Sequence, residues 1–373
     1  TPLLYFSLFH LDLDGGIQIT ASHNPPEHNG FKICLGKDTL HGRGIQEIRE
    51  KMARREFYEK AGGQVESHEI TPAYYQFLLA DVPKLARPLK VVVDGGHSVG
   101  GPVAPPLFRR LGCAVWEIGC ELDATFPLHH PDPTVPENLT ALIDQVKRAG
   151  ADVGIAYDGD ADRLGAVDER GSIVWGDELL ALFSRDVLRR NPGAMIIADV
   201  KCSRRLFTDI EKHGGRPIMW KAGHSLLKAK LKETGALLAG ELSGHIFFKD
   251  RYLGYDDAVY GSLRLLEIVA ASGKPLSSLL ADLPRTFSTP EIRVECPEER
   301  KFLIAQKAAA YFRRHYQVVD IDGVRVEFPD GWGLIRASNT QPALVLRFEA
   351  TSEAKLKEYR ALIESKLREF ERE

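Results

Sequence analysis

Short β-branched segments alternate with helical segments over most of this chain, and this alternation restricts its fold more than any other feature. The first such strand is LKVVVD (89–94), followed by a glycine-rich turn and a helical stretch to Arg110. The further strands expected are 113–119, 151–157, 194–200, 216–220 and 236–240, and the further helices 136–150, 177–190, 203–213, 225–234 and 256–271. A hairpin is expected over 164–175. Strands separated by helices of this kind predict βαβ units with mostly parallel sheets.

The pattern changes after residue 281, where DLPRTFSTPEI (282–292), rich in Pro, Ser and Thr, predicts a linker. Beyond it we expect the strands 291–296, 324–328, 331–338 and 343–350, a helix over 299–314 and a charged terminal helix. Apolar residues at 324, 326 and 328 alternate with Arg325 and Glu327. This alternation predicts a sheet with one wet face, as in antiparallel α+β layers.

The segment before residue 69 has few of the strands that an α/β domain needs. It is shorter than the usual domain of about 100–150 residues. We therefore expect it to form the second half of a domain, with part of its apolar surface exposed.

Charge and cysteine content exclude several classes of protein. The 49 basic and 52 acidic residues give a formal net charge of -3, which argues against nucleic acid or an anionic membrane as the main partner. No apolar run approaches the length of a transmembrane helix. The five cysteines are scattered, odd in number and without metal-ligand spacing, so we expect reduced thiols in a cytoplasmic protein.

A small hydroxyl follows the first predicted strand, in GIQITASHNPPEHNGFK. Apolar residues at 17 and 19 alternate with polar ones, and Asn24 with two prolines then ends regular structure. Ser22 is thus expected in a tight loop at a strand end, where α/β proteins often present a nucleophile. A turn serine that bonds its own backbone is an equally good interpretation of this stretch alone.

Three carboxylates at alternate positions follow the strand that ends at Tyr157, in the segment DGDADR. Asp158, Asp160 and Asp162 would project to one side of an extended loop, and such hard oxygen ligands favour Mg²⁺ or Ca²⁺. An EF-hand is excluded because Arg163 stands where that loop requires glycine. A phosphatase-like aspartyl nucleophile and a solvated acidic turn are weaker alternatives.

Polar side chains follow three more predicted strands. In GELSGH, Glu241 and Ser243 suit the recognition of vicinal sugar hydroxyls, and His245 suits proton transfer near neutral pH. Lys201 and His224 each lie just after a strand. Because the ends of parallel strands face one crevice, we expect these residues to lie near one another.

A turn between two strands of the last region carries RASNTQP. Its arginine, hydroxyls and amide form a plausible phosphate clamp, with turn chemistry alone as the alternative. The residues concerned are Arg336, Ser338, Asn339 and Thr340, with Arg347 on the following strand.

Four of these loops, taken together, resemble the α-D-phosphohexomutase family, most closely its bacterial phosphomannomutase/phosphoglucomutase branch. TASHNP resembles the family's phosphoserine loop, DGDADR its magnesium loop, GELSGH its sugar-recognition loop and RASNTQP its phosphate-binding loop, in the family's order. HHPDPTVPENL, KAGHSLLKAKLKETGALLAGELSGHIFFKD and LRFEATSE also look family-like, so the resemblance runs nearly from end to end.

The resemblance implies an α/β fold of three related domains with mixed, mostly parallel sheets, the first of them incomplete, plus a smaller C-terminal α+β domain around a central cleft. The domains expected are 1–68 with the phosphoserine loop, 69–172 with the metal loop, 173–285 with the sugar-recognition loop and 286–373 with the phosphate-binding loop.

The resemblance also implies a phosphoester on Ser22 that exchanges phosphate with a hexose 1- or 6-phosphate of mannose or glucose through a hexose 1,6-bisphosphate, which serves as activator. Mg²⁺ would be held by Ser22, Asp158, Asp160 and Asp162. The catalytic residues would be Ser22, Lys32, Arg163, His224 and His245. Substrate would be bound by Lys201, Gly223, Glu241, Ser243, Arg336, Ser338, Asn339, Thr340 and Arg347. The partner is a small phosphosugar, and the protein is expected to be a cytoplasmic monomer or weak dimer.

Two alternatives stay open beside this hypothesis. The chain could be a phosphoglucosamine mutase, although GELSGH favours the first hypothesis. It could also bind phosphosugar without turnover, because the family's N-terminal loop with a Tyr and an Arg has no match here. The loop Asp94-Gly95-Gly96-His97-Ser98 stands where relatives usually carry Asn-Gly, and we expect it to be structural.

Overall fold

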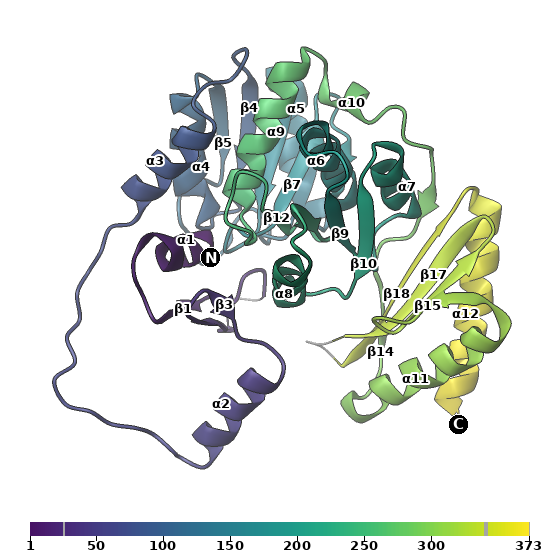
Figure 1. Ribbon diagram of the computed structural model, residues 1–373. Coiled ribbons are helices and arrows are strands. Elements are labelled where there is room, and N and C mark those ends of the chain that lie inside the picture. Colours follow the sequence, from purple (N-terminus) through teal and green to yellow (C-terminus); the bar gives the residue numbers. More distant parts are fainter. Residues whose placement is uncertain (25–26, 339–341, 373) are drawn as a thin grey trace.

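The computed structural model describes residues 1–24, 27–338 and 342–372, which fold into four sheet-containing units (Figure 1). The N-terminal unit covers 1–53, the second unit 71–174, the third unit 176–279 and the C-terminal unit 287–372. One hydrophobic core contains buried side chains from all of the first three units, the second and third units each have a further smaller cluster, and the C-terminal unit has a core of its own. The three-plus-one α/β architecture expected from the sequence is confirmed.

The N-terminal unit is a helix followed by a small antiparallel sheet, in the order β1-β2-β3. Its elements are α1 (Pro2–His10), β1 (Gly15–Ile19), β2 (Phe31–Leu35), β3 (Asp38–Thr39) and α2 (Arg43–Ala53). Gln18 pairs with Lys32, whose side chain therefore lies on the sheet face opposite that of Ile17. That other face leaves Ile17, Ile19 and Phe31 exposed, as expected for this segment. A long segment without helix or strand joins α2 to the second unit (Figure 1).

The second unit is a doubly covered sheet in the order β5-β4-β6-β7-β8, parallel up to β6 and antiparallel beyond it. Its elements are α3 (Thr71–Asp81), β4 (Lys90–Asp94), α4 (Gly100–Arg110), β5 (Ala114–Ile118), η1 (Pro136–Leu139), α5 (Thr140–Ala149), β6 (Val153–Tyr157), β7 (Leu164–Asp168) and β8 (Ile173–Val174). Every residue of β6 and β7 is buried. The loop between these two strands, which carries the three aspartates, is thus held at both ends by core strands.

The third unit repeats this plan in the order β10-β9-β11-β12. Its elements are α6 (Gly176–Arg190), β9 (Met195–Asp199), α7 (Arg204–Lys212), β10 (Arg216–Trp220), α8 (His224–Thr234), β11 (Leu238–Gly240), β12 (Ile246–Phe248), α9 (Ala258–Ser272) and α10 (Leu276–Leu279). Helix α9 contacts α4 and β7, so it joins the second and third units. Lys201 and Glu241 lie in the loops after β9 and β11, and His224 is the first residue of α8, the helix that follows β10, so all three come just after a strand as the sequence predicts.

The C-terminal unit is an antiparallel sheet, β13-β18-β17-β16-β15, with β14 also paired to β18. Its elements are β13 (Phe287–Ser288), β14 (Ile292–Glu295), α11 (Glu298–His315), β15 (Gln317–Val319), β16 (Val324–Phe328), β17 (Gly331–Ala337), β18 (Ala343–Ala350) and α12 (Glu353–Arg372). Helices α11 and α12 pack on the sheet. None of the helices in the described residues is both long and apolar enough to span a bilayer.

The expectation of a wet face on this last sheet is wrong. Arg325 has no exposed surface: its guanidinium donates to the carbonyl oxygens of Val200 and Cys202, at 2.9 and 2.7 Å, and lies 3.8 Å from the centre of the Trp332 ring. The sequence pattern identified the two faces correctly, but the third unit covers the polar one. Charged residues at alternate positions of β16 therefore join two units instead of meeting solvent.

This buried arginine should contribute strongly to stability. We expect Arg325→Met to lower the free energy of unfolding by about 3 kcal/mol, because it leaves Glu327 and two carbonyl groups without their buried partner. Urea denaturation followed by circular dichroism measures this change. Arg313→Met is the matched control, since the half-exposed pair Arg313–Asp320 should change the value by less than about 0.5 kcal/mol. Equal effects of both substitutions would contradict the prediction.

Candidate active site

Ser22 lies in a strained turn just after β1 and faces the acidic loop of the second unit. Its backbone is left-handed, with φ of 52°, and its amide donates to Thr20 Oγ1 at 2.9 Å. Its hydroxyl donates to Asp158 Oδ2 at 2.6 Å and lies 3.1 Å from His23 Nδ1. A residue other than glycine is strained in this conformation and keeps it only where the surrounding structure imposes it. Such residues are found mostly at functional sites.

Glycine at position 159 allows the two loops to approach each other. A Cβ atom added there would lie 1.9 Å from the carbonyl oxygen of Ser22, which is far inside van der Waals contact. We expect Gly159→Ala to displace Ser22 and to lower kcat by about 100-fold, the cost of misplacing a reacting group by about 1 Å. Steady-state kinetics would test this. Gly63→Ala, at an exposed glycine with open space around it, is the control and should leave kcat unchanged.

The three aspartates predicted as metal ligands converge. One oxygen from each of Asp158, Asp160 and Asp162 lies within 4.8 Å of the others, and all three side chains are buried. Lys32 Nζ pairs with Asp160, at 2.6 Å, and with Asp162. The remaining oxygens, Oδ1 of Asp160 and of Asp162, are buried without a hydrogen-bond partner among the described residues.

Electrostatics at this cluster favour a bound cation. Burial raises the pKa of Asp158 to about 8, and the neighbouring Asp162 and Asp160 add to the rise. Burial also acts to raise the pKa of Asp160, but the charge and the hydrogen bond of Lys32, together with other nearby donors, outweigh it and hold that pKa well below its usual range. Hard oxygen atoms with unused lone pairs, in a group too crowded to ionise fully, fit a divalent ion such as Mg²⁺.

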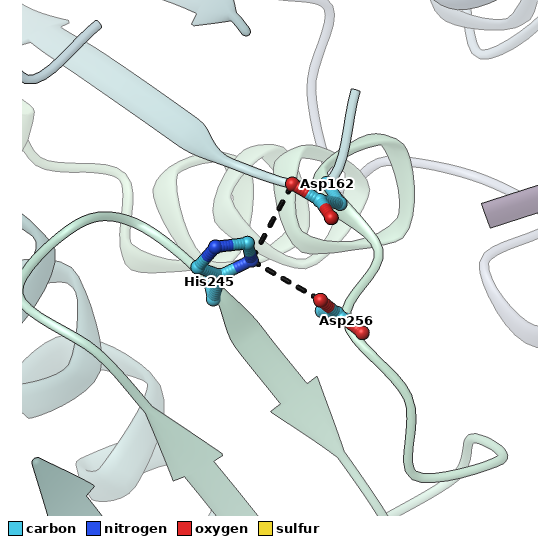
Figure 2. Close-up of side chains that lie close together, drawn as sticks. All are labelled: Asp162, His245 and Asp256. Atoms are coloured by element: carbon cyan, nitrogen blue, oxygen red, sulfur yellow. Dashed lines mark ion pairs between the residues drawn. The ribbon is translucent and has the colours of Figure 1, made fainter. Parts of the chain in front are cut away.

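Arg163, directly after the aspartates, connects the acidic loop to the third unit. It is half-buried, and its Nε donates to His245 Nε2 at 3.1 Å. Its Nη1 lies 3.5 Å from His23 Nε2, beside Ser22. On the other side of the ring, His245 Nδ1 lies 3.1 Å from Asp256 and 3.4 Å from Asp162, as Figure 2 shows. The predicted catalytic residues Ser22, Lys32, Arg163 and His245 are thus brought together.

His224 belongs to the same group. It is the first residue of α8, its Nδ1 lies 3.4 Å from Asp256 Oδ2, and its ring stacks on that of His245 with centres 5.7 Å apart. Burial and the nearby Lys228 lower its pKa. Gly223 precedes it with φ of 131°, a conformation that side chains other than glycine rarely adopt.

The predicted sugar-recognition residues lie next to one another on the loop after β11. Ser243 Oγ is 3.4 Å from Glu241 Oε2, while Oε1 of Glu241 is buried without a hydrogen-bond partner in the described part of the chain. Lys201 is buried and pairs with Glu291 at 3.2 Å and with Asp199 at 3.6 Å. Buried polar atoms are nearly always hydrogen-bonded in native structures, so this carboxylate oxygen is an exception that calls for an explanation.

The predicted phosphate-binding residues are only partly described. Arg336 is buried with Nε 2.9 Å from Asp322, and the amide of Ser338 donates to the carbonyl of Ala343 at 2.9 Å. Asn339 and Thr340 lie outside the described residues. Arg347 donates to the carbonyl of Lys201, so this arginine also joins the C-terminal unit to the third unit.

Charges link these loops into one region. The carboxylate of Glu241 contributes to a raised pKa of Arg163, although burial alone would lower it. Glu241 also acts to raise the pKa of Lys201, whereas Arg336 of the C-terminal unit acts to lower it. Side chains from three units therefore lie within electrostatic reach of one another.

Several neighbours of the site were not predicted. Asp256 faces His245 and His224. His130 Nε2 forms a hydrogen bond with the carbonyl of His23, and the charge of Asp132 acts to raise the pKa of Arg163. The sequence identifies the segment HHPDPTVPENL only by its resemblance to the family. The adjacent pair Asp256-Asp257 could have indicated Asp256. One aspartate is enough to cap α9, and Asp257 does so, which leaves the carboxylate of Asp256 for another role.

The fold and this site define a phosphoryl-transfer enzyme: a strained serine bonded to a buried triple-aspartate loop, with lysine and arginine beside it. Family models for phosphoglucomutase/phosphomannomutase match the chain in four successive parts: alpha/beta/alpha domain I at residues 1–59, domain II at 72–171, domain III at 175–287 and the C-terminal domain at 291–366. The chain belongs to the phosphoglucomutase/phosphomannomutase family of isomerases.

Relatives agree with this assignment. The phosphomannomutase/phosphoglucomutase of Pseudomonas aeruginosa is 48% identical over 371 residues, which cover 99% of this chain and 79% of the relative. That of Pseudomonas putida is 50% identical over 376 residues, covering 100% and 80%. A crystal structure of a phosphoglucomutase/phosphomannomutase family protein from Burkholderia thailandensis is 46% identical and superposes with a TM-score of 0.90, covering 96% of this chain and 77% of the other.

Proposed function

We propose that this chain interconverts hexose 1-phosphates and hexose 6-phosphates of mannose or glucose, with Ser22 as the residue that carries the phosphoryl group. The named activities of relatives at about 48% identity support the reaction. The observation that supports Ser22 as the phosphoryl carrier is its hydroxyl, which lies 2.6 Å from Oδ2 of Asp158 in the buried acidic cluster. No observation favours the phosphoglucosamine alternative over this one.

Asp158, Asp160 and Asp162, with Ser22, would hold Mg²⁺, which when bound offsets the negative charge that develops in phosphoryl transfer. Lys32 and Arg163 would neutralise the negative charge on the equatorial oxygens of the transferring phosphoryl group. Lys32 suits this role because Asp162 and Asp160 raise its pKa against the effect of burial, so that it stays charged.

The sugar and its second phosphate would be bound by residues of the third and C-terminal units. Glu241 and Ser243 would accept and donate hydrogen bonds to ring hydroxyls, and Lys201 and Gly223 would complete the sugar site. His224 is a candidate for proton transfer, and His245 is placed to hold Arg163. The phosphate not reacting would be gripped by Arg336, Ser338, Asn339, Thr340 and Arg347.

Hexose 1,6-bisphosphate would serve as activator, because it can restore the phosphoester on Ser22 after the intermediate is lost. The partner is then a small phosphosugar. We assign the protein to the cytoplasm because its five cysteines are all buried and none forms a disulfide, which suits a reducing compartment.

The test is isomerisation of mannose 1-phosphate and of glucose 1-phosphate by this chain, with Mg²⁺ and a trace of glucose 1,6-bisphosphate. We expect turnover of both sugars, which differ only at the 2-hydroxyl. Binding measured by calorimetry without any turnover, in a folded sample, would overturn the proposal and make this a phosphosugar-binding chain.

A further inference from the structure

Asp256, a buried carboxylate that the proposed function does not use, faces three basic groups. It lies in the loop before α9 with no exposed surface, and its backbone is fixed by a bridge to Phe247 on β12. Its oxygens lie 2.9 Å from Lys228 Nζ, 3.1 Å from His245 Nδ1 and 3.4 Å from His224 Nδ1. A single anion among three such groups must govern where their hydrogens point.

The hydrogen bond from Arg163 determines the form of the His245 ring. A guanidinium group has only donors, so His245 Nε2, which receives the Arg163 Nε–H at 3.1 Å, must present its lone pair. The proton of the neutral ring is then on Nδ1. That atom and Oδ2 of Asp256 are both buried, and neither makes a hydrogen bond of good geometry within the described residues. The 3.1 Å between them is the shorter of the two contacts of Nδ1 with a carboxylate. A proton on Nδ1 directed at Asp256 is the arrangement that leaves neither atom unsatisfied.

Asp162 also faces Nδ1 in Figure 2, but it is the less suitable partner. Its distance to Nδ1 is longer, 3.4 Å, and its other oxygen pairs with Lys32 within the acidic cluster. Asp256 takes no part in that cluster and lies closer.

We propose that Asp256 is a positioning residue, which holds His245 in the Nδ1-protonated form and thereby keeps Nε2 as the acceptor that fixes Arg163 beside Ser22. The inference rests on the proposed function, in which Arg163 stabilises the transferring phosphoryl group. With the proton on Nε2 instead, two N–H groups would face each other and the guanidinium would move away from the ring. Asp256 therefore acts on the reaction through two residues, without touching the substrate.

Asp256→Asn in the full chain tests this. The side-chain amide can present an N–H to Nδ1, which then becomes the acceptor and moves the proton to Nε2, as when the triad aspartate of a serine protease is replaced. We expect kcat to fall about 100-fold with little change in KM for glucose 1-phosphate. Long-range ¹⁵N–¹H correlation spectra of ¹⁵N-histidine-labelled protein should show His245 changing from the Nδ1–H to the Nε2–H form. The signal is assigned by its absence in His245→Gln.

Asp257→Asn is the matched control at the next position. Its carboxylate accepts from the Tyr260 amide at 2.8 Å and from the hydroxyls of Tyr74 and Tyr252, so no histidine is among its hydrogen-bond partners in the described residues. It should lower stability while leaving the tautomer of His245 and kcat of the folded protein unchanged. Asp256→Glu, which keeps the carboxylate, should retain the Nδ1–H form and recover part of the lost kcat.

The spectra decide the inference apart from turnover. An Nε2–H ring in the unsubstituted chain would overturn it, whether or not Asp256→Asn folds. So would a loss of kcat in Asp256→Asn with the tautomer unchanged, because that result indicates a merely structural role. If the unsubstituted chain shows the Nδ1–H form but isomerises no sugar, the proposed function fails and the positioning of His245 by Asp256 stands.

Discussion

A Ser22→Ala variant is expected to lose turnover almost completely while still binding the sugar phosphate. Removing a nucleophile from an enzyme that forms a covalent intermediate costs about 10⁴-fold or more in kcat. Alanine keeps the Cβ atom, so the left-handed backbone at this position is no more strained than before. Binding should persist because the residues proposed to hold the sugar and its second phosphate belong to other units. Kinetics with glucose 1-phosphate and calorimetry with the same ligand separate the two effects.

Phosphate labelling makes this test specific. Incubation with labelled glucose 1,6-bisphosphate should place an acid-stable phosphoester on the unsubstituted chain and none on Ser22→Ala. Label that is released by hydroxylamine would instead indicate an acyl phosphate, as on Asp160. Ser278→Ala, at a position on α10 whose hydroxyl donates to the carbonyl of Pro275, is the matched control and should keep full activity. A fully active Ser22→Ala would rule out the proposed mechanism.

The order and type of the main elements followed from the sequence because their periodicity is local. Strand β6 and helix α6, for example, lie within two residues of where alternation placed them. The short strand β13 was missed, since it lies in a stretch rich in proline and serine and exists only by pairing with β18. Its pairing partner is some sixty residues away along the chain, which no local pattern reveals.

The same reasoning explains which parts of the site were predicted. The aspartates and Ser22 stand in compact motifs, so their residue types and spacing carried the chemistry. Burial of Arg325 and the role of Asp256 depend instead on contacts between units. Alternation along β16 distinguishes two sheet faces but not what covers each. Likewise, the form of the His245 ring is determined by Arg163, which is distant in sequence and adjacent in space.

Chelation of divalent ions is expected to lower kcat by more than about 100-fold, with recovery on addition of Mg²⁺. The physical reason is the crowding of three buried aspartates, two of which keep an oxygen atom without a hydrogen-bond partner in the described residues. A cation that binds only the folded chain must also stabilise it. At a concentration 100 times its dissociation constant the gain is about 2.7 kcal/mol, which thermal denaturation detects without any assay of turnover.

Asp160→Asn distinguishes a specific site from general ionic effects. This substitution removes one charge from the cluster and a partner of Lys32, so both the Mg²⁺-dependent rise in melting temperature and the activity should be lost or strongly reduced. Asp144→Asn, on the exposed side of α5, removes the same charge elsewhere and should change neither. A melting temperature that rises equally with Mg²⁺ in all three proteins would show that the ion binds elsewhere. In that case the aspartates would be balanced by Lys32 alone, and the charge needed for phosphoryl transfer would have to come from the two cationic side chains beside Ser22.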